Sequence, residues 1–131
     1  SSLPNSIVWT TDVCIPISAL AQCILDTHED IQNSGLFAPI VGHVGDGNFH
    51  LLIVIPNDDK SAHRQAHTLN EKLIHRALAM GGTCTGEHGI GKGKKQGLIK
   101  EHGSGVDIME VIKISLDPQN LLGRGNIFSL E

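Results

Sequence analysis

Two histidines flank a predicted turn in the stretch Gly42-His-Val-Gly-Asp-Gly-Asn-Phe-His50. An Asp-Gly pair between apolar runs is typical of a β-hairpin tip, so a turn centred on Asp46-Gly47 places His43 directly opposite His50. Opposed residues of an antiparallel pair share a face, with Cβ atoms about 4.5–5.5 Å apart. Two imidazoles in this arrangement can bind one metal ion. The alternative is a half-buried pair that hydrogen-bonds to the backbone.

A glycine-rich stretch, Gly81-Gly-Thr-Cys-Thr-Gly-Glu-His-Gly-Ile-Gly91, offers a third ligand. Glu87 and His88 stand between two glycines, which allow the backbone to approach another element closely. Two histidines and a glutamate leave coordination positions open, as catalytic metal sites do. The alternative role for Glu87 is that of a negative charge at the N-terminus of the following helix.

Other motifs are less specific. Residues 86–92 fit the spacing GxxxxGK, but Gly93 stands where a phosphate-binding loop needs Ser or Thr. His63 and His67 lie four residues apart on the polar side of a predicted helix, which favours a solvated face. Nucleophilic catalysis has little support, because there is no Gly-x-Ser-x-Gly motif and the cysteines lack CxxC spacing. The odd cysteine count indicates reduced thiols in an intracellular protein: Cys14, Cys23 and Cys84.

The positioning elements follow from periodicity and turn residues. The segments alternate as strand, helix, strand, strand, helix and a short strand. The strands are residues 7–17, two within 38–55, and 83–85, and the helices are residues 19–33 and 60–80. We expect Ser18 to cap the start of the first helix and Gly35 to end it in the left-handed conformation. This order predicts an α+β fold, a ferredoxin-like antiparallel sheet with helices on one face. A helical C-terminal segment follows from about Gly91, with one helix at 105–116 and an irregular tail.

Composition excludes several classes of function. The chain has 131 residues, a net charge of -4 and 3% aromatic residues. It lacks the basic footprint and the stacking surface of a nucleic-acid-binding protein. No apolar stretch has the length of a transmembrane helix, and no targeting segment is visible at the start.

The sequence resembles the C-terminal part of the FAD-linked D-2-hydroxyacid dehydrogenases, in the D-lactate dehydrogenase (cytochrome) branch. The resemblance is carried by four stretches in order along the chain: Thr11-Asp-Val-Cys-Ile-Pro-Ile17, Gly42 to His50, Gly81 to Gly91, and Ile112-Lys-Ile-Ser-Leu-Asp-Pro-Gln-Asn-Leu121. The second and third are long and specific.

This resemblance implies a set of roles. His43, His50 and Glu87 match the ligands of a divalent metal, Zn or Mn, and His88 matches the catalytic base. Asn48 is implied as a cofactor-site residue that orients the site. The implied reaction passes a hydride from a D-2-hydroxy acid to FAD and yields the 2-oxo acid. The electron acceptor is a cytochrome c or an electron-transfer flavoprotein. The implied location is mitochondrial in a eukaryote, and cytoplasmic or membrane-peripheral in a bacterium.

Departures from the family pattern refine these expectations. Leu52 stands where the related 2-hydroxyglutarate enzymes have Asn, which favours a small or apolar substrate. Residues 123–126 replace the family's Asn-Pro-Gly-Lys. A chain of 131 residues cannot hold the FAD-binding domain. Residues 1–131 are thus expected to be the C-terminal part of the substrate domain plus the C-terminal segment, inactive alone and prone to self-association through exposed apolar surface. The alternatives are a stand-alone ferredoxin-like metal-binding module and a fragment whose histidines are structural.

Overall fold

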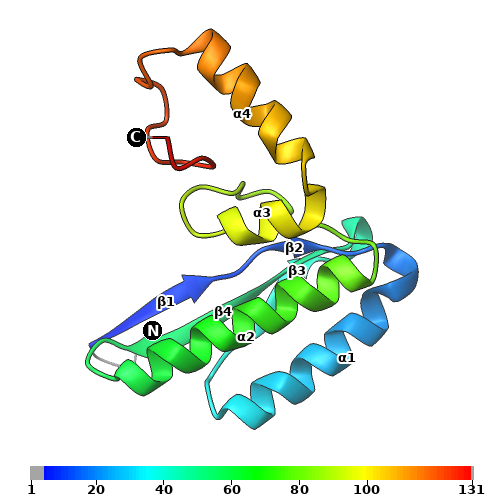
Figure 1. Ribbon diagram of the computed structural model, residues 1–131. Helices are drawn as coiled ribbons and strands as arrows, with labels where there is room; N and C mark the ends of the chain where they lie inside the picture. Colours follow the sequence, from blue (N-terminus) through cyan, green and yellow to red (C-terminus); the bar gives the residue numbers. More distant parts are fainter. Residues whose placement is uncertain (1–4, 131) are drawn as a thin grey trace. The chain divides into compact units, whose positions relative to one another are not determined.

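The sheet is built around strand β4 (Asn48–Pro56), in a computed structural model that describes residues 5–130. Strands β1 (Ser6–Thr10) and β2 (Val13–Cys14) pair antiparallel with successive parts of one edge of β4, and β3 (Ile40–His43) pairs antiparallel with the other (Figure 1). β-Branched residues suit these pleated positions, as in the run Ile53-Val54-Ile55. Thr83 bridges Cys14, so the predicted fourth strand is reduced to a single bridge.

Helices α1 (Ile17–Ser34) and α2 (Lys60–Ala79) cover one face of this sheet (Figure 1). Alternate residues of β4 point toward them, and all four are at most 1% exposed: Phe49, Leu51, Ile53 and Ile55. The buried residues of α2 recur at helical spacing: Ala62, Ala66, Leu69, Leu73, Ile74 and Ala77. The predicted α+β, ferredoxin-like arrangement is therefore confirmed. Asn48 and His50 alternate to the opposite side of β4, called here the outer face.

The helix ends match the predictions in part. Gly35 ends α1 in the left-handed conformation, at φ 68°, as predicted. The Asp59 side chain caps α2 by accepting hydrogen bonds from the amides of Ser61 and Ala62. The prediction that Ser18 caps α1 is wrong, because Pro16 occupies the N-cap position and its carbonyl accepts the amide of Ala19. Proline lacks an N–H and has a fixed φ, so it suits a helix start.

The hairpin that carries His43 and His50 has a different register from the predicted one. A 3-10 turn at Val44–Asp46 and then Gly47 join β3 to β4, so His43 pairs with Asn48 and Val41 pairs with His50. The prediction that His43 lies directly opposite His50 is therefore wrong. The strands are shifted by two residues, an even number, and both histidines stay on the same face of the hairpin.

A contact outside the hairpin explains this shift. Gly47 has φ 77°, and its carbonyl accepts the amide of Ile15 at 2.9 Å. A Cβ on Gly47 would lie 2.0 Å from the Ile15 carbonyl oxygen. Gly47 is thus held against Ile15, just before α1. The turn is therefore formed by Val44–Asp46, which precede Gly47, and is not centred on Asp46-Gly47.

The chain divides into two compact units, Ser1–Gly86 and Glu87–Glu131. The second unit contains α3 (Lys95–His102), α4 (Gly105–Leu116) and an irregular tail, which confirms the helical C-terminal segment. No residue of α4 is buried within the described structure, and its exposed apolar residues are Ile108, Val111, Ile112, Ile114 and Leu116. No helix within residues 5–130 is both long and apolar enough to span a bilayer.

Asp117 holds the turn that follows α4. Its carboxylate accepts hydrogen bonds from Lys113, Leu121 and Leu122, and these lower its pKa to about 2. Because the folded pKa is below the ordinary value of about 3.9, this stabilisation is full above that value and is lost as the pH falls through about 2. For Asp117→Asn we therefore expect weaker hydrogen-exchange protection of residues 105–122 at pH 5 to 7.

The difference from the wild-type protein should shrink as the pH is lowered below about 4. Asp107→Asn, at an exposed position in the first turn of α4, is the matched control and should change protection little. Equal protection of wild type and Asp117→Asn at pH 6 would contradict the role of this carboxylate.

Candidate metal centre

His50 lies on the outer face of β4 and is 6% exposed. Its Nδ1 lies 3.0 Å from the carbonyl oxygen of Thr11, and 3.5 Å from Oδ1 of Asp12. A carbonyl oxygen can only accept, so Nδ1 carries the proton in this hydrogen bond, and in the neutral ring the lone pair is then on Nε2. This is the arrangement of a metal-binding histidine, whose second ring nitrogen donates to a carbonyl or a carboxylate.

Asp12 joins the His50 environment to the glycine-rich stretch. Its side chain is fully buried, and Oδ2 accepts hydrogen bonds from the Thr85 hydroxyl at 2.9 Å and the Gly86 amide at 2.8 Å. A Cβ on Gly86 would lie 2.3 Å from Oδ1 of Asn48 and 2.7 Å from Oδ1 of Asp12. Glycine is required at position 86 because these side chains occupy the space of any larger residue.

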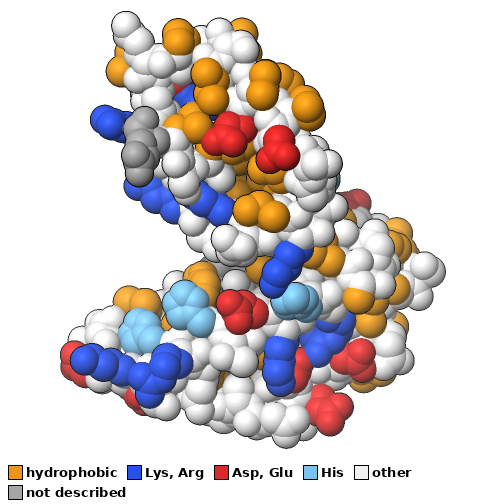
Figure 2. Space-filling view, in the orientation of Figure 1, with side chains coloured by type: hydrophobic (Ala, Val, Ile, Leu, Met, Phe, Trp, Pro, Cys, Tyr) orange, Lys and Arg blue, Asp and Glu red, His pale blue; other side chains and the backbone are white. Residues whose placement is uncertain are grey.

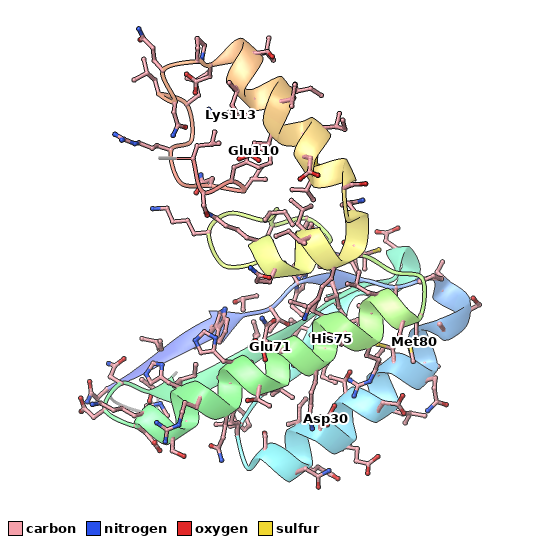
Figure 3. All side chains as sticks on the ribbon, in the orientation of Figure 1. Asp30, Glu71, His75, Met80, Glu110 and Lys113 are labelled. Carbon is pink, nitrogen blue, oxygen red and sulfur yellow. The ribbon has the colours of Figure 1, made fainter. Side chains whose placement is uncertain are left out.

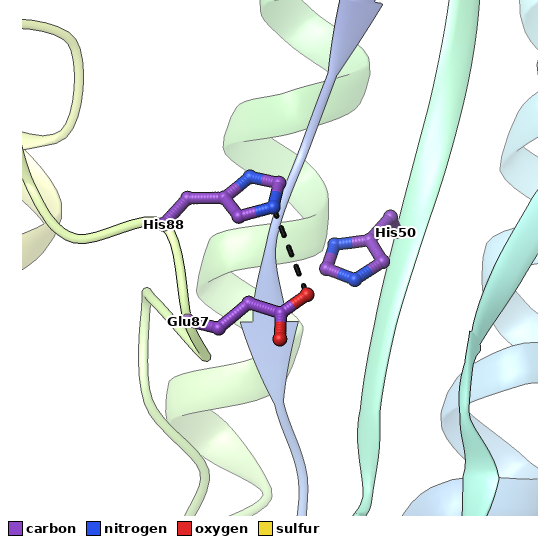
Figure 4. A group of neighbouring side chains, drawn as sticks. All are labelled: His50, Glu87 and His88. Carbon is purple, nitrogen blue, oxygen red and sulfur yellow. Dashed lines mark ion pairs between the residues drawn. The ribbon is translucent and has the colours of Figure 1, made fainter.

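Glu87 and His88 follow Gly86 directly and complete a group with His50. Each of the three offers one ligand atom, and these atoms all lie within 4.8 Å of one another (Figure 4). Nε2 of His88 lies 3.7 Å from Oε1 of Glu87, and both side chains are about half exposed. Two imidazole nitrogens and a carboxylate oxygen are a donor set that suits Zn and Mn.

The other predicted site residues lie nearby on the first unit. His43 is exposed and pairs with Asn48 across the hairpin, but it is not in the group of three. Asn48 is 7% exposed, and its Oδ1 has no hydrogen-bond partner among the described residues. A buried amide oxygen without a partner is costly, so a ligand that donates to this oxygen would stabilise the site.

The cysteines do not suggest a nucleophile. None of the three forms a disulfide in the described part of the chain, and Cys23 and Cys84 are buried. Burial raises the pKa of the Cys23 thiol, although a hydrogen bond from Thr27 opposes the shift. A buried thiol with a raised pKa is unreactive, which agrees with the weak support for nucleophilic catalysis.

Motifs and spacing in the sequence predicted no role for Thr11 and Asp12. In the structure, these residues orient His50 and anchor Gly86. A signal was present in the sequence, since these two polar residues interrupt a segment that is otherwise rich in apolar and β-branched residues. A buried carboxylate must be paired or hydrogen-bonded. Polar residues inside a predicted core strand are therefore candidates for a supporting role in a site.

With the fold and this geometry established, comparison with known proteins identifies the class. The chain belongs to the family of FAD linked oxidases, C-terminal domain, whose model matches residues 2–127. The probable D-lactate dehydrogenase, mitochondrial, of Danio rerio is 48% identical over 128 residues, which are 97% of this chain and 26% of that protein. The D-lactate dehydrogenase [cytochrome], mitochondrial, of Kluyveromyces lactis is 42% identical over 129 residues, 98% of this chain and 22% of that protein.

A solved structure shares the fold at low sequence identity. The 4-ethylphenol oxidase from Gulosibacter chungangensis, in a complex with isoeugenol, superposes with a TM-score of 0.67 and 17% identity, over 95% of this chain and 25% of that one. The chain thus spans about a quarter of the length of the relatives named here, between 22% and 26%.

Proposed function

We propose that this chain is the metal- and substrate-binding part of an FAD-dependent dehydrogenase that oxidises D-lactate or a related D-2-hydroxy acid to the 2-oxo acid. The observation that carries the proposal is the group of His50, Glu87 and His88, with Nδ1 of His50 bound to the Thr11 carbonyl. Similarity to D-lactate dehydrogenases over nearly the whole chain supports the substrate class.

In this proposal His50 and Glu87 hold a divalent metal, with His43 as a further ligand from the facing strand. The proton on Nδ1 of His50 directs Nε2 to the ion, and the fully buried Asp12 holds Gly86 so that Glu87 starts from an anchored backbone. A bound divalent ion supplies charge that favours loss of the substrate's hydroxyl proton.

His88, which stays uncoordinated in this proposal, is the base that takes this proton. It is about half exposed, so a small acid can reach its ring. Asn48 would orient the site through its buried amide, and Leu52 beyond His50 favours a small or apolar substrate. We propose that residues 1–131 are the C-terminal part of the substrate domain plus the C-terminal segment. FAD would then be bound mainly by other parts of a longer protein.

The names of the relatives suggest the cellular setting. Several are called mitochondrial, and the Kluyveromyces lactis and Saccharomyces cerevisiae proteins carry the word cytochrome. We therefore propose a mitochondrial location if the source is a eukaryote, with a cytochrome as electron acceptor. The exposed apolar residues of α4 support the expectation that the chain self-associates when alone.

Metal content of the 131-residue chain tests the site. After loading with Mn²⁺, which the imidazole pair on α2 does not favour, and dialysis against metal-free buffer, the wild-type chain should retain one equivalent by elemental analysis. His50→Ala and Glu87→Gln should each weaken binding at least about ten-fold, since loss of a ligand costs no less than loss of its supporting residue. His43→Ala should also weaken it, because His43 is the third proposed ligand.

His28→Ala is the control, because His28 is exposed on α1 and bonds to Gln32 there. It should retain wild-type metal content, and circular dichroism should show that every variant is folded. Retention of a full equivalent by both His50→Ala and Glu87→Gln would refute the proposed centre.

A further inference from the structure

We propose a second transition-metal site on the side of α2 away from the core, formed by the histidine pair His63 and His67. The two histidines lie four residues apart, and Glu71 and His75 continue the row at the same interval. Figure 2 shows histidine and acidic side chains succeeding one another along this helix, and Figure 3 labels Glu71 and His75 on it. The group of three that includes His50 uses none of these residues.

The helix holds the backbone of the row in place. Residues four apart on a helix are neighbours, with Cβ atoms about 5–6 Å apart, and a pair of histidines at this spacing can bind one ion. α2 runs unbroken from Lys60 to Ala79, with its opposite side buried and its first turn capped by Asp59. Because the helix already fixes the backbone, a bound metal has to order only the side-chain rotamers of the two histidines.

The ring of His67 is already restrained. It lies edge-on to Trp9 of β1, with centroids 4.7 Å apart and an interplanar angle of 62°. Trp9 pairs with Ile53, whose side chain points toward the helices, whereas His50 is on the outer face. The proposed α2 site and the His50 side chain thus lie on opposite faces of the sheet.

The basic side chains of α2 near His63 and His67 interact with α1 instead of with these histidines. Lys72 binds Asp30 of α1 at 2.8 Å, and the Arg76 guanidinium also pairs with Asp30. Burial raises the pKa of Asp30, but the hydrogen bonds from Lys72 and Arg76 outweigh burial and leave it below its ordinary value. Arg64 faces α1 too, where it lines a cavity of about 300 Å³ with Asp30 and Lys72. None of the described residues forms an ion pair with Glu71.

Imidazole pairs prefer Cu²⁺, Ni²⁺ and Zn²⁺ over Mg²⁺ or Ca²⁺, so the ligand class is a divalent late transition metal.

Trp9 provides a direct readout, because it is the single tryptophan of the chain. As the free Cu²⁺ concentration rises at pH 7.5, Trp9 fluorescence of the 131-residue chain should fall to a plateau as one equivalent fills the α2 site. His63→Ala should weaken this quenching at least about ten-fold without touching Trp9, since it removes a ligand. Glu71→Gln should weaken it less, and His28→Ala should leave it unchanged.

The two sites can be separated with His50→Ala. If the α2 site exists, Trp9 in this variant should be quenched at the same free Cu²⁺ concentration as in the wild-type chain. This result does not depend on how much manganese the variant retains. The inference is overturned if His63→Ala is quenched as tightly as wild type, or if His50→Ala alone abolishes quenching. Loss of the His50 centre with retained quenching would leave the α2 site standing and refute only the proposed dehydrogenase metal.

Discussion

Replacement of Asp12 by alanine is expected to lower the free energy of unfolding of the first unit by about 2–4 kcal/mol, from the loss of charge-assisted hydrogen bonds and the burial of unpaired groups. The fully buried carboxylate accepts from the Thr85 hydroxyl and the Gly86 amide, and lies 3.5 Å from the His50 ring. Urea unfolding followed by Trp9 fluorescence measures the change.

The same variant should weaken metal binding by about 10–100-fold, as supporting residues of metal ligands do. Asp12→Asn separates the two effects, because an amide oxygen can still accept from Gly86 while the negative charge near His50 is lost. We expect a folded protein with reduced metal affinity. Asp58→Ala, at an exposed position, is the control and should change neither quantity. Wild-type stability of Asp12→Ala would show that Asp12 does not anchor Gly86.

The second large effect is expected at Gly47. Alanine there should cost about 2–5 kcal/mol, because the left-handed backbone is strained with a side chain and the new methyl group forces neighbouring atoms to move. φ is 77°, and a Cβ would lie 2.0 Å from the carbonyl oxygen of Ile15. Gly47 joins β3 to β4, so displacing it from Ile15 should also loosen the hairpin that carries His43 and His50.

Two other glycines separate these causes. Gly35 has φ 68° with nothing within 4 Å of its Cβ position, so Gly35→Ala reports strain alone, about 1–2 kcal/mol. Gly45 has neither positive φ nor a neighbour within 4 Å, and Gly45→Ala should stay within about 0.5 kcal/mol of wild type. Chemical denaturation of the three variants should give the order Gly47, Gly35, Gly45. A Gly47→Ala effect no larger than that of Gly35→Ala would mean that Ile15 does not constrain the turn.

Local patterns in the sequence were sufficient for the helices and the fold class. The apolar residues of α2 recur with the helical period, and Gly35 marks the left-handed end of α1. The order of strands and helices then leaves few ways to pair the sheet. The family was also legible in the sequence, because its long motifs are contiguous in the chain.

The register of the hairpin and the support of His50 depended on contacts between distant segments. Gly47 is held by Ile15, and His50 is held by Thr11 and Asp12, which lie between β1 and β2 about forty residues earlier in the chain. A local turn preference of an Asp-Gly pair is worth little against a buried backbone hydrogen bond of this kind. Residue types and their spacing thus determined which side chains could bind metal. Only tertiary packing decided that His50 pairs with Val41, that Nδ1 is occupied by a carbonyl, and that Asp12 anchors the segment that leads to Glu87.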